Sequence, residues 1–256
     1  MIVPGENEMK SEPLWHCPIL RFILLTLLLA FTFQAKPVSA EEGFLETSDG
    51  VKLFYEYFQA SPQKGAIVLL HGWGTSYNEW SEFREFLNKN GWSTIAIDFR
   101  GHGASTERGE EYLNFEDFGQ AERGKMLSID IAAARNFLGD VKPIWLIGSS
   151  FGAALGFSYA VRQKDILGVV LLSPALEYPE QGYQVEMSKY GNRPILVATS
   201  QDDDARAFDS ATFLNKYAQG EAKFIQYETA GHGTRMFDFD KELKDKILQW
   251  LDQNSK

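Results

Sequence analysis

The feature that most constrains the fold of this chain is an alternation of short apolar runs with helical patterns from residue 66 onward. The runs are rich in Val, Ile and Leu, as strands buried on both faces of a parallel sheet should be. They lie at residues 66–70, 93–97, 144–147, 169–172, 195–198 and 224–227. Helical patterns separate most of them, at residues 80–87, 127–138, 152–161, 205–217 and 241–251. This alternation predicts an α/β fold with a doubly wound, mostly parallel sheet.

Two further strand-like runs, 44–47 and 51–57, flank the turn sequence Ser48-Asp49-Gly50. They predict an antiparallel hairpin that opens the fold. No internal repeat, low-complexity tract or linker interrupts the sequence after this hairpin. Residues 41–256 are therefore expected to form a single domain, and they are numerous enough to bury a substantial core.

Residues 1–40 have a different character. Lys10 and Arg21 precede the apolar run 22–33, and Val38-Ser39-Ala40 follows it. This order is typical of a secretory signal peptide cleaved after Ala40. The apolar run is shorter than the roughly 20 residues that span a bilayer. We predict a secreted or periplasmic protein without a stable membrane span in its mature chain, with a membrane anchor formed by residues 22–33 as the alternative.

Charge and cysteine content narrow the range of partners. The net charge of −10 argues against nucleic acid as a partner, because phosphates would be repelled. The only cysteine, Cys17, lies in the predicted signal peptide. The mature chain is thus expected to lack disulfides, a thiol nucleophile and cysteine-based metal sites. We expect no cofactor, no metal and a small-molecule substrate, while the sequence gives no oligomeric state.

A candidate nucleophile lies in Gly148-Ser149-Ser150-Phe151-Gly152, between the apolar run 144–147 and a helical pattern. A strand that turns sharply into a helix holds the central residue at strained backbone angles and exposes its hydroxyl. The two glycines give such a crowded turn room. G-x-S-x-G also occurs by chance in ordinary turns, so the pentapeptide needs a base, an acid and an oxyanion site in support.

A serine hydroxyl is a weak nucleophile until a base takes its proton. Three histidines follow the predicted signal peptide: His71, His102 and His232. His232 follows the last predicted strand, in a glycine-containing loop that can carry the ring across the sheet edge toward Ser150. The alternative is an ordinary surface histidine. We predict that His232 is the base.

The base needs an acid that fixes its tautomer and stabilises the imidazolium. Asp202, Asp203 and Asp204 come soon after the predicted strand 195–198, where parallel sheets place functional groups. A solvated acidic turn or a helix N-cap is the structural alternative for two of the three. Calcium binding is disfavoured because the alternating ligand spacing of a calcium loop is missing.

An acyl-transfer intermediate carries an oxyanion that needs preorganised amide donors. Two backbone N–H groups are candidates for this oxyanion hole. One belongs to Phe151, directly after the candidate nucleophile, and the other to Trp73, between Gly72 and Gly74 in the turn after the strand 66–70. The turn around Trp73 can also be interpreted as an ordinary tight strand-to-helix turn. This structural role is compatible with a role in the oxyanion hole.

Several motifs in order resemble the alpha/beta-hydrolase superfamily, from Phe44 to the C-terminus. They are His71-Gly72-Trp73-Gly74, Asp98-Phe99-Arg100-Gly101-His102-Gly103, Gly148-Ser149-Ser150-Phe151-Gly152, the acidic turn and Gly231-His232. The resemblance implies the chain order Ser, Asp, His for the triad. In that family the acid commonly lies three residues after a small residue that ends the strand. Alignment of Ser200 with that small residue implies that Asp203 is the acid. Because Ser200 stands where glycine is frequent, Asp202 and Asp204 stay open as alternatives.

The resemblance also bears on the chemistry. Relatives that open epoxides or displace halide carry an aspartate where this chain has Ser150, so acyl transfer to water is expected. His102 resembles a structural turn residue of the family. Only residues 173–194 are available for a cap, which implies an esterase- or lipase-like enzyme without an elaborate lid.

These inferences predict a secreted serine hydrolase that cleaves carboxylic esters through an acyl-enzyme. Its triad is Ser150, His232 and Asp203, with Trp73 and Phe151 in the oxyanion hole. Aminopeptidase-like or thioesterase activity on the same triad is an alternative, because these reactions share the acyl-enzyme and differ mainly in the leaving group. A hydrolase fold used only as a binding module is the alternative from another class.

Overall fold

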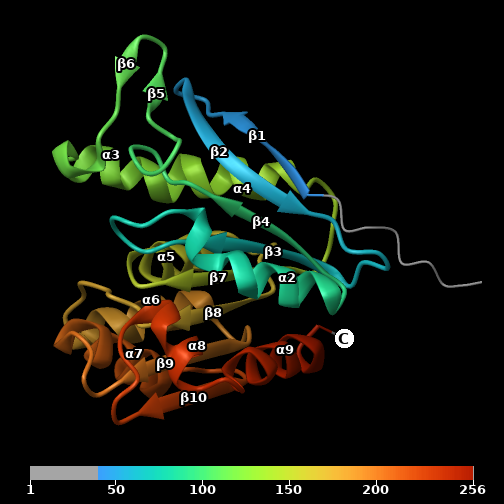
Figure 1. Cartoon of the computed structure of the whole chain (residues 1–256). Helices are drawn as coiled ribbons and strands as arrows, with labels where there is room; N and C mark the ends of the chain where they lie inside the picture. The colour runs from blue at the N-terminus through green and yellow to red at the C-terminus, as the bar shows by residue number, and fades with distance from the viewer. Residues whose placement is uncertain (1–39, 256) are drawn as a thin grey trace, which may run out of the picture. The chain divides into compact units, whose positions relative to one another are not determined.

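Ten strands form one mostly parallel sheet within residues 40–255, which are the residues that the computed structural model describes (Figure 1). The strand order is β10-β9-β8-β7-β3-β4-β2-β5-β6, and β1 pairs with β2 beside this path. The strands are β1 (Ala40–Glu46), β2 (Val51–Phe58), β3 (Gly65–Leu70), β4 (Trp92–Ile97), β5 (Glu107–Arg108), β6 (Glu111–Tyr112), β7 (Ile144–Ser149), β8 (Gly168–Leu172), β9 (Ile195–Ser200) and β10 (Ala222–Tyr227).

Helices fill the connections between these strands. They are α2 (Ser81–Lys89), α3 (Gln120–Lys125), α4 (Ile131–Phe137), α5 (Phe151–Arg162), α6 (Glu180–Tyr190), α7 (Ala205–Tyr217), α8 (Met236–Phe239) and α9 (Leu243–Gln253). Short 3-10 turns lie at η2 (Tyr77–Trp80), η3 (Phe115–Asp117) and η5 (Gly233–Arg235), and a π turn, η4 (Met126–Asp130), joins α3 to α4.

The predicted parallel strands and the predicted hairpin are confirmed. β4, β3, β7, β8, β9 and β10 pair in parallel, each with its neighbour in the sheet. β1 and β2 pair antiparallel around the turn that contains Gly50, whose φ is 80°. β2 also pairs antiparallel with β4, so the antiparallel strands gather at one edge. The fold is the expected doubly wound α/β sheet.

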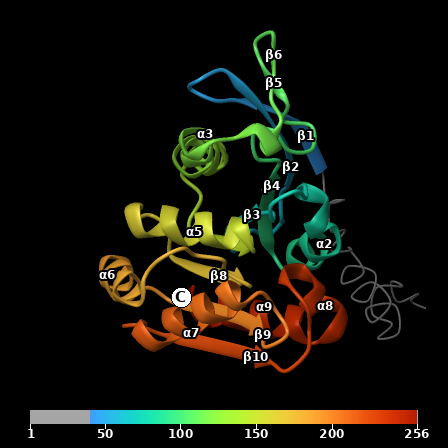
Figure 2. The ribbon, with the colours of Figure 1, turned by 90° about the vertical axis from the view of Figure 1, so that its left-hand side faces the viewer.

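Both faces of the sheet are covered, which explains why its central strands are apolar throughout. In β3, Val68 and Leu70 belong to one hydrophobic cluster, while Ile67 and Leu69 belong to another. The first cluster includes side chains of α4, α5, α6 and α7, and the second includes those of α2, α8 and α9. Figure 2 shows α3, α5 and α6 on one side of the strands and α2 and α8 on the other. Because side chains alternate along a strand, each face needs its own apolar set.

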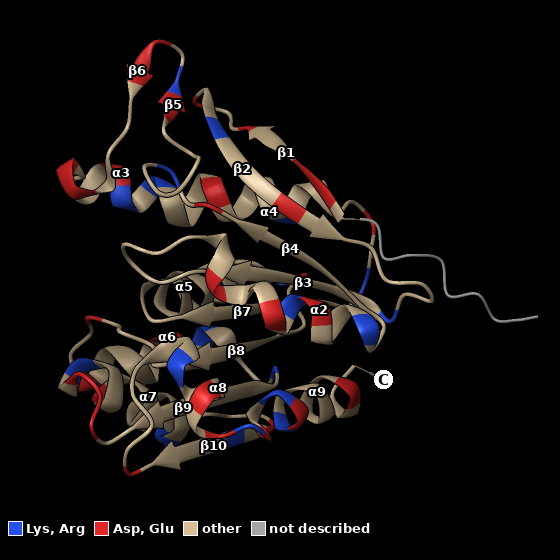
Figure 3. Cartoon of the chain, viewed as in Figure 1, with Lys and Arg blue, Asp and Glu red and all other residues tan. Residues whose placement is uncertain are grey.

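Two regions differ from the sequence-based expectations. No helix was predicted within residues 173–194, which contain the eleven-residue helix α6. Its buried side chains, Tyr183, Met187 and Tyr190, follow helical spacing, but polar neighbours and Gly182 mask the pattern. The second region is the short hairpin β5–β6, which extends from the rest of the sheet (Figure 1) and carries mainly acidic side chains (Figure 3).

The predicted signal peptide, residues 1–40, and the alternative anchor, residues 22–33, fall almost wholly outside the described residues. Of that segment only Ala40 is described, as the first residue of β1. None of the helices between residues 40 and 255 is long and apolar enough to cross a membrane. Export and cleavage after Ala40 therefore stay predictions.

Candidate active site

Ser150 occupies a strained turn between β7 and α5. Its backbone has φ 52° and ψ −114°, a region that residues other than glycine seldom adopt. β7 ends at Ser149 and α5 begins at Phe151, so the turn is a single residue. The Ser150 N–H donates to the carbonyl of Leu172 at 2.8 Å, which ties the turn to the end of β8. The candidate nucleophile thus lies at the carboxyl edge of the parallel strands.

The glycines on either side of Ser150 are required by close backbone approach. A Cβ added to Gly148 would lie 2.5 Å from the Cα of Ala153. A Cβ added to Gly152 would collide with the carbonyl oxygen of Leu70, at the end of β3. The G-x-S-x-G pattern therefore follows from how tightly α5 packs against the ends of β3 and β7.

His232 pairs with Asp203. His232 follows β10, and its Nδ1 lies 2.5 Å from Oδ1 of Asp203, which follows β9. The Asp203 side chain is 1% exposed, whereas that of His232 is 40% exposed. The hydrogen bond to Asp203 raises the pKa of His232, and burial of the ring opposes this effect. A carboxylate on Nδ1 leaves Nε2 as the nitrogen that can accept a proton.

The three consecutive aspartates have three different partners. Asp202 accepts hydrogen bonds from the Ser200 hydroxyl and from the N–H groups of Ala230 and Gly231, at 3.2 and 3.3 Å for the two N–H groups. Asp204 is the N-cap of α7 and accepts from the N–H of Arg206 at 2.9 Å. Asp203 alone among the three contacts His232. The N-cap expected for part of this run is present at Asp204.

The loop that carries His232 is seated against the ends of β7 and β8. The Gly233 N–H donates to the Ser173 hydroxyl at 2.8 Å. A Cβ at Gly233 would collide with the Ser149 hydroxyl, so only glycine allows this approach. The loop thus lies beside the residue that precedes Ser150. Within residues 40–255, no hydrogen bond joins Ser150 itself to His232, and such bonds often close only when substrate binds.

The two candidate oxyanion donors belong to turns that lie close to Ser150. Phe151 is the first residue of α5, so its N–H is outside the hydrogen-bond ladder of the helix. Gly72, beside Trp73, is close to the nucleophile, because a Cβ there would lie 3.6 Å from Cβ of Ser150. The rings of Trp73 and Phe151 meet edge to face, with centroids 5.0 Å apart. Both turns therefore meet at Ser150.

His71 and His102 are buried and are not joined to the Asp203–His232 pair. His71 Nε2 accepts from the N–H of Phe99 at 3.0 Å, and its Nδ1 donates to the carbonyl of Gly72 at 2.7 Å. Burial lowers the pKa of His71 to about 3, which keeps the ring neutral. His102 stacks on Phe115 with ring centroids 4.1 Å apart, and burial lowers its pKa as well. These contacts are those of packed core histidines.

Two polar residues near the site have no counterpart in the sequence-based expectations. Ser173 is fully buried, has φ 51°, and holds the Gly233 N–H. Glu79, in η2, accepts hydrogen bonds from the turn that contains Trp73. The sequence offered little sign of either, since a lone serine or glutamate is common in loops. Only their contacts connect them to Ser150 and His232.

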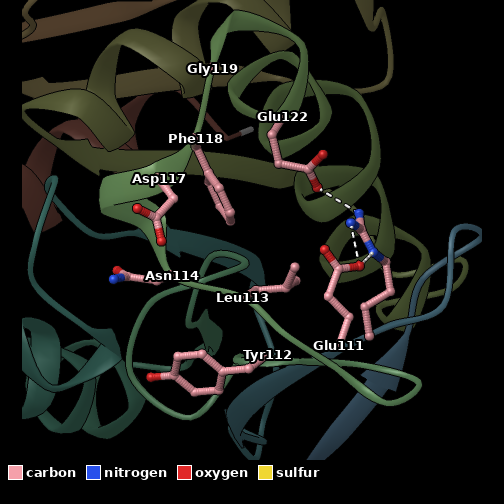
Figure 4. A pocket seen from close by; sticks show the side chains of 9 residues that line it. Glu111, Tyr112, Leu113, Asn114, Asp117, Phe118, Gly119 and Glu122 are labelled. Carbon is pink, nitrogen blue, oxygen red and sulfur yellow. Dashed lines mark hydrogen bonds and ion pairs between the residues drawn. The ribbon is translucent and has the colours of Figure 1, made fainter.

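The segment from β5 to α3 packs beside the Trp73 turn. Phe115 meets the Trp73 ring edge to face at 5.1 Å, and the Arg123 guanidinium lies 4.5 Å from the centre of that ring. The same segment holds a pocket of about 310 Å³ (Figure 4), in which Tyr112, Asn114 and Asp117 lie around open space. The full lining is Arg108, Glu111, Tyr112, Leu113, Asn114, Asp117, Phe118, Gly119 and Glu122.

That pocket does not include Ser150, Asp203 or His232. Its carboxylates Glu111 and Glu122 are engaged in ion pairs with Arg108, drawn in Figure 4. Among residues 40–255, no group of three or more His, Cys, Asp or Glu side chains is arranged to hold a metal ion.

Comparison with known proteins identifies relatives of several activities. The chain is 27% identical over 195 residues to the bifunctional esterase/perhydrolase DCH of Acinetobacter calcoaceticus, covering 74% of this chain and 59% of that protein. It is 27% identical over 166 residues to the proline iminopeptidase of Thermoplasma volcanium, covering 59% of this chain and 52% of that protein. The chain thus spans only between half and three fifths of these two relatives.

A non-heme chloroperoxidase, CPO-A1 of Kitasatospora aureofaciens, is 31% identical over 208 residues, covering 75% of this chain and 70% of that protein. Among solved structures, the esterase Pf2001 of Pyrococcus furiosus superposes with a TM-score of 0.67 at 20% identity, over 86% of this chain and 94% of that one. A monoacylglycerol lipase of Paleococcus ferrophilus superposes with a TM-score of 0.63 at 19% identity, over 79% of this chain and 99% of that one. These two likenesses show the fold.

The family model of the alpha/beta hydrolase fold matches residues 65–192, from β3 to the loop after α6. This span contains the Trp73 turn and the strained turn at Ser150. Together with the sheet order and the relatives above, the match shows that the chain belongs to the alpha/beta hydrolase fold family.

Proposed function

We propose that this chain is a serine hydrolase that cleaves carboxylic esters through an acyl-enzyme. The observation that carries the proposal is the contact of His232 with Asp203, in a loop seated beside the strained turn of Ser150. A buried carboxylate that fixes an imidazole near a partly exposed serine is the arrangement needed to activate a hydroxyl.

In the proposed mechanism, Oγ of Ser150 attacks the acyl carbon of the ester and Nε2 of His232 takes its proton. Asp203 holds the ring in this tautomer and stabilises the imidazolium that forms. The negative oxygen of the tetrahedral intermediate accepts hydrogen bonds from the N–H groups of Trp73 and Phe151. The intermediate collapses as His232 returns the proton to the departing alcohol. Water then repeats the sequence on the acyl-enzyme and releases the acid.

The backbone donors fit this role because each has an N–H free for the oxyanion. Phe151 begins α5, and the N–H of Trp73 makes no hydrogen bond among the described residues. An amide at the start of a helix also favours a negative charge through the helix dipole. Removing one such donor lowers kcat by about 100- to 1,000-fold in a serine protease.

A fluorophosphonate probe tests the enzyme claim directly, since it labels only an activated serine. We expect covalent labelling of the wild-type chain and none of Ser150→Ala. The matched control is Ser149→Ala, one residue earlier on β7, which should still be labelled. A folded wild-type chain that is not labelled would instead support a hydrolase fold used as a binding module.

Substrate class is tested on esters, amides and thioesters of the same acyl group. We expect the ester to be hydrolysed with the largest kcat/KM. Preference for an aminoacyl amide or for a thioester would redirect the proposal to the aminopeptidase-like or thioesterase alternative, which would use the same triad.

A further inference from the structure

Glu79 brings a carboxylate to the back of the turn that carries Trp73. Its Oε1 accepts a hydrogen bond from the N–H of Gly72 at 3.2 Å, and its Oε2 accepts one from the Thr75 hydroxyl at 2.6 Å. Glu79 lies in η2, the 3-10 turn that follows this loop. One side chain therefore binds both ends of the segment Gly72–Thr75.

The rest of this turn is closed by its own hydrogen bonds. The Gly72 carbonyl accepts from Nδ1 of His71 at 2.7 Å and from the N–H of Thr75 at 3.3 Å. The Thr75 hydroxyl also lies 2.9 Å from the Gly72 carbonyl. With the N–H groups of Gly72 and Thr75 both bonded, those of the two residues between them, Trp73 and Gly74, make no hydrogen bond among residues 40–255.

The same carboxylate is close to the proposed catalytic residues. A Cβ at Gly72 would lie 3.7 Å from Oε2 of Glu79 and 3.6 Å from Cβ of Ser150, so Gly72 is flanked by both. The pKa of Glu79 is raised, because burial outweighs the opposing hydrogen bonds from Thr75, Gly72 and Ser149 and the charge of His232. The Gly72 N–H and the Thr75 hydroxyl are both able to donate to the two oxygens of Glu79.

We propose that Glu79 is a positioning residue, whose carboxylate fixes the Gly72–Thr75 turn so that the Trp73 N–H meets the oxyanion. This inference rests on the proposed function, because it assigns the turn an oxyanion to bind. Glu79 itself does not contact the reacting atoms in this arrangement. It acts by restricting the backbone conformations of a glycine-rich turn. Without this restriction, the hydrogen bond from the Trp73 N–H to the oxyanion would be weaker during the reaction.

The test uses Glu79→Ala and Glu79→Gln in the full chain, with Glu82→Gln as the matched control. Glu82 lies on α2, its side chain is 90% exposed, and its substitution by glutamine changes the net charge equally. Active sites are counted with the fluorophosphonate probe, so that unfolded protein does not enter the rates. The kcat, the KM and the inhibition constant of a trifluoromethyl ketone, which forms a tetrahedral oxyanion adduct, are then compared.

We expect Glu79→Ala to lower kcat by about 100-fold with KM nearly unchanged, and to weaken the ketone by a similar factor. Glu79→Gln should retain part of the rate, because its amide oxygen can still accept from the Gly72 N–H. Glu82→Gln should match the wild type. A merely structural role would reduce the count of active sites and leave kcat per site and ketone affinity unchanged.

The outcomes separate this inference from the proposed function. The inference would be overturned if both Glu79 variants kept the wild-type kcat per active site, or if only their KM increased. The proposed serine hydrolase activity would not be affected by either result. A wild-type chain that is not labelled would overturn the proposed function and this inference together. If Glu79→Ala does not fold, Glu79→Gln and Thr75→Val provide the same comparison from the two ends of the 2.6 Å hydrogen bond.

Discussion

The contact between Asp203 and His232 decides most of the chemistry proposed for this chain at the scale of single residues. Three aspartates are adjacent in sequence, yet their contacts differ. Asp202 holds the loop before His232, Asp203 holds the ring, and Asp204 caps α7. Changing them one at a time therefore separates a role in proton transfer from a role in loop structure.

We expect Asp203→Asn to lower kcat on an ester by about 10,000-fold, the loss seen when the triad aspartate of a serine protease becomes asparagine. The same change should move the acid limb of the kcat/KM profile to lower pH. The sign follows from the hydrogen bond of Asp203, which raises the pKa of His232. A base works only when unprotonated, so a lower pKa keeps it neutral in more acidic solution. Rates measured from acidic to mildly alkaline pH report both effects.

Asp202→Asn and Asp204→Asn are the matched controls for this experiment. Both remove one negative charge from the same loop, but neither removes the hydrogen bond to His232. We expect each to keep most of kcat, with a smaller shift of the acid limb. The acid assignment would be wrong if either control lost more activity than Asp203→Asn.

At the scale of elements, the strand-turn-helix unit around Ser150 depends on how closely α5 approaches the end of β3. The unit concentrates strain at one residue, since Ser150 has a positive φ while its neighbours belong to regular β7 and α5. Such strain persists only where the surrounding packing holds it. Gly152 is the part of this packing that a substitution can probe.

Gly152→Ala should lower the free energy of unfolding by about 1–3 kcal/mol, because the new methyl group would press on the carbonyl of Leu70. Urea denaturation followed by circular dichroism measures the change. Gly124→Ala on α3 is the control, since a Cβ there would meet nothing within 4 Å. Alanine is the better helix former, so this control should gain up to about 1 kcal/mol. Equal effects at both sites would contradict the packing argument.

At the scale of the whole molecule as described by residues 40–255, one buried arginine connects segments that are distant in sequence. The Arg100 side chain is fully buried and pairs with Asp130 at 2.6 Å, Asp49 at 2.8 Å and Glu122 at 2.8 Å. These partners come from the π turn, the β1–β2 turn and α3. Burial raises the pKa of Asp130, and Arg100 counters that effect. The cluster therefore joins the antiparallel edge to the helix that covers it.

Arg100→Gln is expected to lower the free energy of unfolding by about 3–5 kcal/mol, because Asp130 would be left buried without its cation. The exposed pair of Lys52 with Glu107 gives the comparison, since its side chains are 54% and 60% exposed. Lys52→Gln should have a much smaller effect on stability, because solvent screens an exposed ion pair. Denaturant titration of both variants measures the difference, and similar losses would show that the buried cluster adds no stability of its own.

Much of the fold could be predicted from the sequence, because its signals are local. An apolar run such as 66–70 reports burial on both faces of a sheet, and this predicted β3 and its parallel neighbours. The G-x-S-x-G pattern predicted a strained turn at Ser150, which is present. The helix α6 was missed, because its three buried residues are diluted by polar neighbours and by Gly182.

The sequence by itself determined the doubly wound sheet, the family resemblance and the residue types of the candidate site, since these depend on patterns a few residues long. Only the tertiary structure decided which of three adjacent aspartates contacts His232, and that Glu79 holds the Trp73 turn. The physical reason differs for the two contacts. Asp203 and His232 follow the paired strands β9 and β10, so the pairing of these strands sets their distance. Glu79 turns back onto Gly72 and Thr75 within one connection, and the fold of that connection decides the contact. When tertiary structure sets the position of a side chain, the local sequence does not predict which residue it contacts.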